Sequence, residues 1–442
     1  MCRIFSTLSL CICFLSFGWM TQGCTNAQAK KLKVSSKGEL GTEGRIFYPS
    51  DTDQGDLGNI AGIGRLYLKA KYGKFKLSFR GFGRHDGFDR KRSALFPEEA
   101  YLEYKQNPIL IRLGYQLQTW TATEAFHPAD IINSRYLDGS VQAPEKRGEL
   151  MGLARLKFGS GNIELFFMPL FSSPIFPSED SRFRFGPLGQ AISQIQILDR
   201  NGKIDDDPWR LQYGARMQQR LFGADLSVHL VRHIDRSLPL VLADFSSGGL
   251  SAPPKISLVY QALTQIGGTL QSVVGPFLVK LEAAHRDFDQ PTTAERDRLP
   301  PAPFLSLADR DHTLIAVGLE YNIYHSQGES ALLLEGQYAR WREGGEAPDG
   351  SLLLFDKDLL FGWRYAFNDV VDRSITTSLI IDVKEIEQFF ANIVYGQRIG
   401  DVWRAELGLR LISFPPKDPN NPQGPEYIDQ ANYAYTSLIR YF

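Results

Sequence analysis

The chain has 442 residues, of which 43% are hydrophobic and 12% aromatic, and its formal net charge at pH 7 is −1. The length would accommodate two or three ordinary domains, but no Pro-, Gly- or Ser-rich linker divides the sequence. The near-neutral charge favours neither an acidic nor a basic partner. Beyond the first residues every apolar run is short and interrupted by charges, which excludes a bundle of transmembrane helices.

The first residues have the order of charge, apolar run and small residues that is typical of a secretory signal peptide. Arg3 precedes the apolar run, and Ala27-Gln28-Ala29 forms a small-x-small site. This pattern predicts a signal peptide over 1–29, cleaved after Ala29, and a mature chain that begins at Lys30. A retained membrane anchor is the alternative, although the apolar run is short for a span.

The cysteines support export, because all four lie in this leader, at Cys2, Cys11, Cys13 and Cys24. A lipoprotein cleaved before Cys24 is a further alternative, although Thr21 stands where a branched aliphatic residue is usual. After Ala29 the chain has no thiol, so we expect neither a disulfide framework nor a cysteine metal site.

Alternation of apolar and polar residues recurs along the rest of the chain and predicts β-strands. A weak first strand is expected near 38–48. Between Arg65 and Arg80, two alternating segments flank a tight turn at Gly73, with apolar residues on one face and mostly lysine and arginine on the other. The pattern returns in further segments, at 210–220, 359–367 and 402–411.

The connections between these strands alternate between short and long. Short ones are expected at Gly73, 106–108, 159–162, 222–223, 275–276, 368–369 and 400–401, and long ones near 83–96, 119–149, 170–209, 235–258, 288–310, 341–354 and 413–431. This predicts an all-β protein, a single transmembrane antiparallel β-barrel over 30–442 with about 18 strands, or about 16 without one weak pair. Its short turns would be periplasmic and its long loops extracellular. A soluble sandwich would also alternate, but it would not place aromatic residues so regularly near strand ends.

The end of the chain fits this fold. The sequence closes on Phe442, and a terminal aromatic residue is usual in such barrels and forms part of their assembly signal. We therefore expect the barrel-assembly machinery as a partner, besides outer-membrane lipid and lipopolysaccharide. Arg440 shares a face with Phe442, where an apolar residue is normal, and this leaves the orientation of the last strand open.

Two strand segments and a loop carry a family resemblance. The strand segments are Tyr101-Leu102-Glu103-Tyr104 and Arg112-Leu113-Gly114-Tyr115-Gln116, and the loop contains Trp120, Glu124, Phe126, His127-Pro128-Ala129-Asp130 and Ile131-Ile132-Asn133. This stretch resembles an uncharacterised porin-like family of Gram-negative outer-membrane barrels, related in style to alginate-export proteins, with a W-G-x-x-D-x-x-N-P-x-D-x-x-N-P type of loop. The chain departs from that pattern at four positions, Tyr115, Thr121, His127 and Ser134. The resemblance implies a barrel and transport, and it names no substrate.

The loop at 119–149 is the first candidate site. Its apolar side chains give it something to bury, which is uncommon in a free surface loop, and Asp130 and Asn133 can accept hydrogen bonds from backbone N–H groups. We therefore expect a constriction element that folds into the lumen, with the candidates Trp120, Glu124, Phe126, His127, Asp130, Asn133 and Arg135. The alternative is a loop packed on the barrel rim without contact with solute.

Catalysis and metal binding are not expected. His127 has no second histidine at ligand spacing, no H-E-x-x-H motif occurs, and no serine or cysteine nucleophile stands in a Gly-rich elbow. No cofactor is expected either.

The strand face opposite the lipid is rich in basic residues, whereas many acids gather in loop segments such as DRNGKIDDD and FDKD. The pore-lining basic candidates are Arg65, Lys69, Lys74, Lys76, Arg80, Arg112, Arg210, Arg216, Arg404 and Arg410. Rings of arginine or lysine favour anions. Alternatively, these bases pair with loop acids, with wall neighbours such as Glu99 and Glu103, or with lipopolysaccharide phosphates at the rim.

Three functions follow from this interpretation. The first is a porin-like channel for small, anionic solutes, and small solutes are then its partners. The second is an export barrel for lipid-like or polymeric cargo that acts with a periplasmic or inner-membrane partner, which an apolar lumen would favour. The third is an outer-membrane enzyme, for which the sequence supplies no outward Ser-His pair. The sequence names neither the solute nor the oligomeric state.

Overall fold

The computed structural model describes residues 31–48, 57–89, 92–137, 144–178, 181–183, 192–237, 239–244, 255–297, 310–342, 353, 355–418 and 424–442. The expected leader and its cleavage site lie outside these residues. Among the described residues, no helix has the length and apolar character that crossing a membrane requires.

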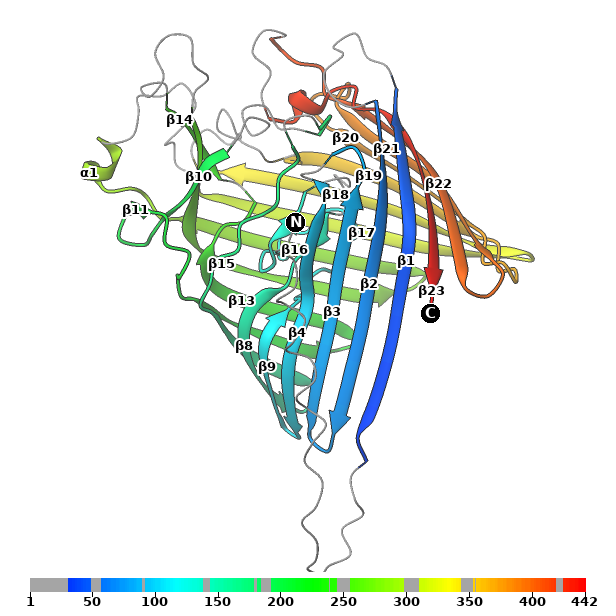
Figure 1. The fold of residues 1–442 in the computed structure, drawn as a ribbon, viewed down its shortest axis with the longest axis horizontal. Coiled ribbons are helices and arrows are strands. Elements are labelled where there is room, and N and C mark those ends of the chain that lie inside the picture. The colour runs from blue at the N-terminus through cyan, green and yellow to red at the C-terminus, as the bar shows by residue number, and fades with distance from the viewer. Residues whose placement is uncertain are drawn as a thin grey trace, which may run out of the picture.

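Eighteen strands of the described chain form one antiparallel barrel (Figure 1). They are β1 (Lys33–Phe47), β2 (Gly58–Tyr72), β3 (Phe75–Asp86), β4 (Ala94–Gln106), β5 (Ile109–Gln116), β8 (Glu149–Phe158), β9 (Gly161–Met168), β12 (Gln212–Leu221), β13 (Ala224–Ile234), β15 (Lys255–Val274), β16 (Phe277–Phe288), β17 (His312–His325), β18 (Gly328–Trp341), β19 (Lys357–Ala366), β20 (Ser374–Asp382), β21 (Phe389–Ile399), β22 (Trp403–Ser413) and β23 (Tyr433–Tyr441). The first and last strands pair from Glu39↔Tyr441 to Phe47↔Tyr433 and close the barrel. The strand count expected from the sequence is confirmed.

Short turns gather at one end of the barrel and long connections at the other (Figure 1). The seven short connections expected from the sequence all fall between paired strands, and Gly73 has the positive φ of 58° that its turn requires. The turn between β17 and β18 was not anticipated. The first strand begins earlier than the expected 38–48, because its register with β2 runs back to Lys33↔Lys71.

Two long connections contain strands of their own. β10 (Ile192–Leu198), β11 (Ile204–Asp205) and β14 (Leu240–Asp244) extend the sheet beyond the barrel, because β10 and β14 pair with the first part of β15. The expected loop at 235–258 therefore ends earlier, at the start of β15. The remaining small elements are the hairpin β6 (Arg135–Tyr136) and β7 (Glu145–Lys146), the helix α1 (Thr293–Arg296) and the 3₁₀ helix η3 (Gly424–Ile428).

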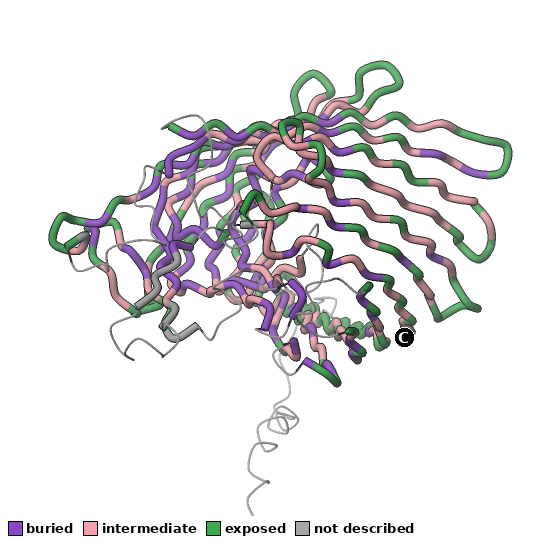
Figure 2. The backbone as a smooth tube through the Cα atoms, turned by 90° about the horizontal axis from the view of Figure 1, so that it is seen from above, coloured by how far each residue is buried: buried purple, intermediate pink, exposed green. Residues whose placement is uncertain are grey.

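The period of two in the sequence separates the two faces of the wall. On β2 and β3, Leu66, Leu77 and Phe79 are exposed on the outer face, whereas Arg65 is only 19% exposed on the inner face. Farther along the wall, strands β19 to β22 place Phe361, Trp363, Leu379, Ile393 and Leu409 side by side on the outside. Figure 2 shows buried and exposed stretches alternating along the strands. An apolar outer band of this kind is what a lipid-facing barrel requires.

The orientation of the last strand is also settled. Phe442 is 62% exposed and exchanges two backbone hydrogen bonds with Gly38, at 2.9 and 3.0 Å. Arg440 lies on the same outer face, and its guanidinium carbon lies 5.9 Å from the centre of the Trp403 ring. A cation over an aromatic ring at the barrel rim explains why a charged residue stands among apolar ones here.

Candidate functional site

The segment 117–134, here called the inner loop, lies against the inner wall of the barrel. Trp120 is 1% exposed. Its ring lies 5.4 Å from that of Phe166 on β9 and 4.9 Å from that of His229 on β13, and the Arg216 guanidinium of β12 lies over it at 5.1 Å. These partners belong to the inward faces of their strands, so the start of the loop packs inside the barrel.

The middle of the inner loop reaches a different part of the wall. Phe126 is buried in an apolar cluster with Leu360 of β19, Ile380 of β20 and Phe390 of β21, and its ring lies 5.6 Å from that of Phe355. Trp120 and Phe126 therefore contact strands well separated around the barrel. The loop spans part of the lumen rather than covering one patch of wall.

Glu282 on β16 holds the inner loop by its backbone. Its Oε1 accepts hydrogen bonds from the N–H groups of Ala122 at 2.6 Å and Thr123 at 3.0 Å, and its Oε2 accepts one from Ala129 at 3.2 Å. The carboxylate is fully buried. A charged acceptor strengthens such bonds, and the loop N–H groups in turn satisfy the buried charge.

Glu335 on β18, two strands from β16, holds the loop in the same way. It accepts hydrogen bonds from the backbone N–H groups of Glu124 at 2.6 Å and Ala125 at 2.9 Å. The side chain of Glu124 is in turn bound by Lys280 of β16, which donates to Oε1 at 2.6 Å and to Glu320 at 3.0 Å. The sequence places Glu282 and Glu335 among the few acids on the mainly basic inner strand face, but it did not predict that they would hold the loop.

Asp130 and Asn133 fix the shape of the loop itself. Asn133 accepts from the backbone N–H of Gln118 at 2.7 Å and donates to the carbonyl oxygens of Gln116 and Arg147. Asp130 pairs with Arg135 at 3.1 Å and Lys146 at 2.5 Å. Burial lowers the pKa of Lys146, against the opposing attraction of Asp130.

A cavity of about 270 Å³ lies beside the inner loop. Its lining includes Phe126, His127 and Asp130 from the loop, and Arg236, Arg286 and Gln337 from elsewhere. His127 lies 3.8 Å from Glu282 and is 24% exposed. The Pro128 carbonyl oxygen accepts hydrogen bonds from Gln265 and Arg286, both at 3.4 Å, so this side of the cavity is also tied to the wall.

The basic residues expected in the lumen are mostly paired. Arg65 contacts Glu39, Glu98 and Glu145 at 3.0, 3.2 and 2.6 Å. Lys76 and Arg112 share Glu103, at 3.2 and 2.6 Å. Arg404 pairs with Glu406 at 3.0 Å and with Asp372 at 3.3 Å. Much of the basic face is therefore neutralised by acids.

A β-bulge decides which acid of β4 neutralises Arg80. The register with β3 shifts between Arg80 and Gly81, so that Glu98 turns inward and becomes buried. Arg80 contacts Glu98 at 2.8 Å, although it stands opposite Glu99 in the ladder. Of the two acids that the sequence offered as neutralising neighbours, Glu103 forms ion pairs and Glu98 takes the place of Glu99, because simple alternation does not include the extra residue.

The other basic candidates have different surroundings. Lys74 lies at the β2–β3 turn and donates to Gln106 at 2.6 Å, and Arg410 donates to the Tyr433 hydroxyl at 2.8 Å. Lys69 is exposed and Arg216 is buried. Arg210 was expected on a strand, but β12 begins at Gln212, and Arg210 instead pairs with Asp205 and Asp207 in the preceding connection.

Four arginines of the described chain bond only to neutral partners. Arg286 donates to Gln265 at 2.9 Å, Arg310 to Gln261 at 2.7 Å, Arg216 to Ser227 at 3.3 Å and Arg147 to the Ser173 carbonyl oxygen at 2.7 Å. Within the described parts of the chain, no carboxylate lies at ion-pair distance from these four side chains. The sequence analysis predicted only Arg216 among them. Arg147 and Arg310 lie outside the strands, and nothing in the sequence distinguishes Arg286 from the many other basic residues on strands.

The pKa values of two groups outside the strands, Asp235 and Arg310, are shifted by burial and by nearby charges. Burial opposes ionisation of Asp235, yet Arg286 and the hydrogen bonds of Ser237 outweigh it and hold the pKa of Asp235 below its ordinary value. Burial lowers the pKa of the Arg310 guanidinium to about 10, against the opposing attraction of Asp235. At neutral pH, the negative charge of Asp235 therefore partly offsets the positive charges of Arg286 and Arg310.

Neither a protein-family model nor a curated protein sequence matches the chain. Among solved structures, OpdO of Pseudomonas aeruginosa aligns with a TM-score of 0.50 at 10% identity, over 92% of this chain and 96% of that one. A BenF-like porin from Pseudomonas fluorescens gives 0.49 at 8% identity, over 93% and 98%. An anion-selective porin from Comamonas acidovorans gives 0.44 at 12% identity, over 93% and 100%. The likeness to OpdO shows the fold alone, a closed antiparallel β-barrel.

Proposed function

We propose that the chain is an outer-membrane porin-like channel for small, anionic solutes, with the inner loop as its constriction. The observation that carries the proposal is the attachment of this loop to two wall carboxylates, Glu282 and Glu335, through five backbone hydrogen bonds. A loop that only capped the rim would have no need of buried acceptors on the inner faces of β16 and β18.

The size of the solute is limited by this arrangement. The loop fills part of the lumen from the wall around Phe166 to the wall around Leu360. The cavity beside it, at about 270 Å³, is slightly below the usual range of small-molecule pockets. The channel therefore suits small solutes better than polymers.

The preference for anions rests on the arginines rather than on the basic strand face as a whole. Arg65, Arg80 and Arg112 are neutralised by Glu98 and Glu103. Arg286, Arg310 and Arg216 carry charge without an ion-pair partner among the described residues. A positive, low-dielectric passage raises the local anion concentration.

Export of lipid-like cargo has weaker support. An apolar cluster does lie inside the barrel, but its members bury one another, and loop residues such as Phe126, Phe183 and Phe414 fill it. The cluster packs loops against the wall and leaves no exposed apolar surface for cargo. Lipid around the outer band, lipopolysaccharide at the rim and recognition of Phe442 by the barrel-assembly machinery belong to the same proposal.

Planar-bilayer recordings of the refolded protein test the proposal. Deletion of 121–134 should raise the single-channel conductance, and heat-modifiable electrophoretic mobility should verify that the barrel still assembles. Reversal potentials in a salt gradient should indicate anion preference in the full-length channel. Unchanged conductance in the folded deletion variant would place the constriction elsewhere, and a cation-selective wild-type channel would refute the anion preference.

A further inference from the structure

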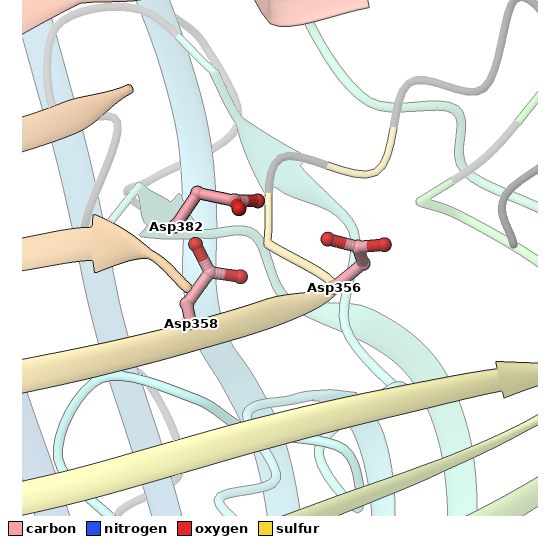
Figure 3. A group of neighbouring side chains, drawn as sticks. All are labelled: Asp356, Asp358 and Asp382. Carbon is pink, nitrogen blue, oxygen red and sulfur yellow. The ribbon is translucent and has the colours of Figure 1, made fainter. Parts of the chain in front are cut away.

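Three aspartates converge where β19 begins and β20 ends. Asp356 immediately precedes β19, Asp358 is its second residue, and Asp382 is the last residue of β20 and stands opposite Asp358 in the ladder. One carboxylate oxygen from each lies within 4.8 Å of the others. Figure 3 shows the three carboxylates turned toward one another.

The cluster contains a buried oxygen without a partner. Asp358 is 4% exposed, and its Oδ2 is buried and has no hydrogen-bond donor. Among the described residues, no lysine or arginine forms an ion pair with any of the three aspartates. This differs from Glu282 and Glu98, whose buried carboxylates receive backbone or arginine donors. A buried carboxylate that faces two others is costly unless a cation or a proton compensates it.

One of the aspartates is held in place by the backbone. Asp382 Oδ1 accepts hydrogen bonds from the N–H groups of Lys384 at 2.6 Å and Glu385 at 2.7 Å. These bonds fix the orientation of the carboxylate and leave Oδ2 for another partner. The register of β19 with β20 fixes Asp358 opposite it, so two of the three donors stand on a rigid sheet.

We propose that Asp356, Asp358 and Asp382 form a binding site for a divalent cation, with Ca²⁺ as the fitting ion. Ca²⁺ takes oxygen ligands at about 2.3–2.6 Å, so oxygens that share one ion lie at most about 5 Å apart. The three aspartates meet that limit. Mg²⁺ is less suited, because it keeps several waters and uses one or two carboxylates in a strict octahedron.

Bound Ca²⁺ would join the end of β20 to the start of β19 and to Asp356, just before that strand. It would also neutralise two of the three negative charges that the aspartates carry when ionised. The site lies on the wall and is independent of the channel proposal, because it needs neither conduction nor selectivity.

Calorimetric titration of CaCl₂ into protein refolded in detergent, free of lipopolysaccharide and stripped with EDTA, tests the site. We expect one ion per chain, with a dissociation constant on the order of 10⁻⁴–10⁻³ M, as in extracellular Ca²⁺ modules. Asp358→Asn should weaken binding at least tenfold. Glu385→Gln is the matched control, because it removes one charge from the same connection but no ligand, and its binding should equal that of wild type.

Thermal unfolding supplies the second measurement. Ca²⁺ should raise the melting temperature of wild type and of Glu385→Gln, and leave Asp358→Asn unchanged. If Asp358→Asn fails to refold, Asp382→Asn takes its place, with the same expectation. Absence of Ca²⁺ binding by wild type, or equal binding by the aspartate variant, would overturn the proposal and leave a shared proton as the compensating charge.

Discussion

The backbone N–H of Ala122 donates a 2.6 Å hydrogen bond to the buried carboxylate of Glu282, a residue 160 positions later in the chain. Thr123 and Ala129 donate to the same carboxylate. A single side chain on β16 thereby holds both ends of a short loop segment. The position of the inner loop depends on a residue far outside it.

Replacing Glu282 with Gln should loosen the inner loop. The amide keeps one acceptor oxygen, but its NH₂ group faces a loop N–H that then lacks a partner, at a cost of about 1–3 kcal/mol. We expect a larger or noisier single-channel conductance and a lower melting temperature.

Glu164→Gln is the control for this variant. Glu164 is also buried on the inner wall, but it pairs with Arg155 and contacts no part of the inner loop through a hydrogen bond. Its substitution should lower stability without changing conductance. Equal conductance changes in both variants would mean that wall charge, not loop attachment, sets the width.

The β-bulge on β4 predicts different effects for two adjacent glutamates. Glu98→Gln removes the acid that Arg65 and Arg80 share and should lower the free energy of unfolding by about 1–3 kcal/mol. Glu99→Gln makes the same chemical change and should leave stability nearly unchanged. Denaturant titrations followed by tryptophan fluorescence would compare them. A larger loss of stability in Glu99→Gln than in Glu98→Gln would show that β3 and β4 pair without the bulge.

Ion selectivity should depend on the position of a charge. Arg286→Gln removes a cation that lines the cavity and has no ion-pair partner among the described residues, whereas Arg80→Gln removes one beside Glu98. Both variants lose one positive charge. Reversal potentials should move toward cation preference more strongly in the Arg286 variant, because its field acts in a narrower, less screened passage. Equal shifts would indicate that total charge alone matters.

The mature chain should begin at Lys30 and partition with outer membranes. N-terminal sequencing of protein purified from the cell envelope would test this prediction. The leader contains the only cysteines, so a lipid-modified Cys24 would appear as a blocked, lipid-bearing N-terminus. That result, or a cytoplasmic location, would contradict the prediction.

The sequence by itself determined the barrel. Alternation in segments such as 65–80 fixes which side chains face lipid, because successive residues on a strand point to opposite faces. The rhythm of short and long connections predicts about 18 strands. The apolar content of the inner loop was also visible, because Trp120 and Phe126 are local features of the sequence.

Only the tertiary structure decided the charge pattern and the anchors. Glu98, and not Glu99, pairs with Arg80 because the β-bulge adds one residue to the ladder. Glu282 contacts Ala122 only when the barrel closes. Asp358 and Asp382 become neighbours through strand register, 24 positions apart in the chain. Such contacts depend on pairing between distant segments, and a period of two sets the face of a side chain without naming its partner across the lumen.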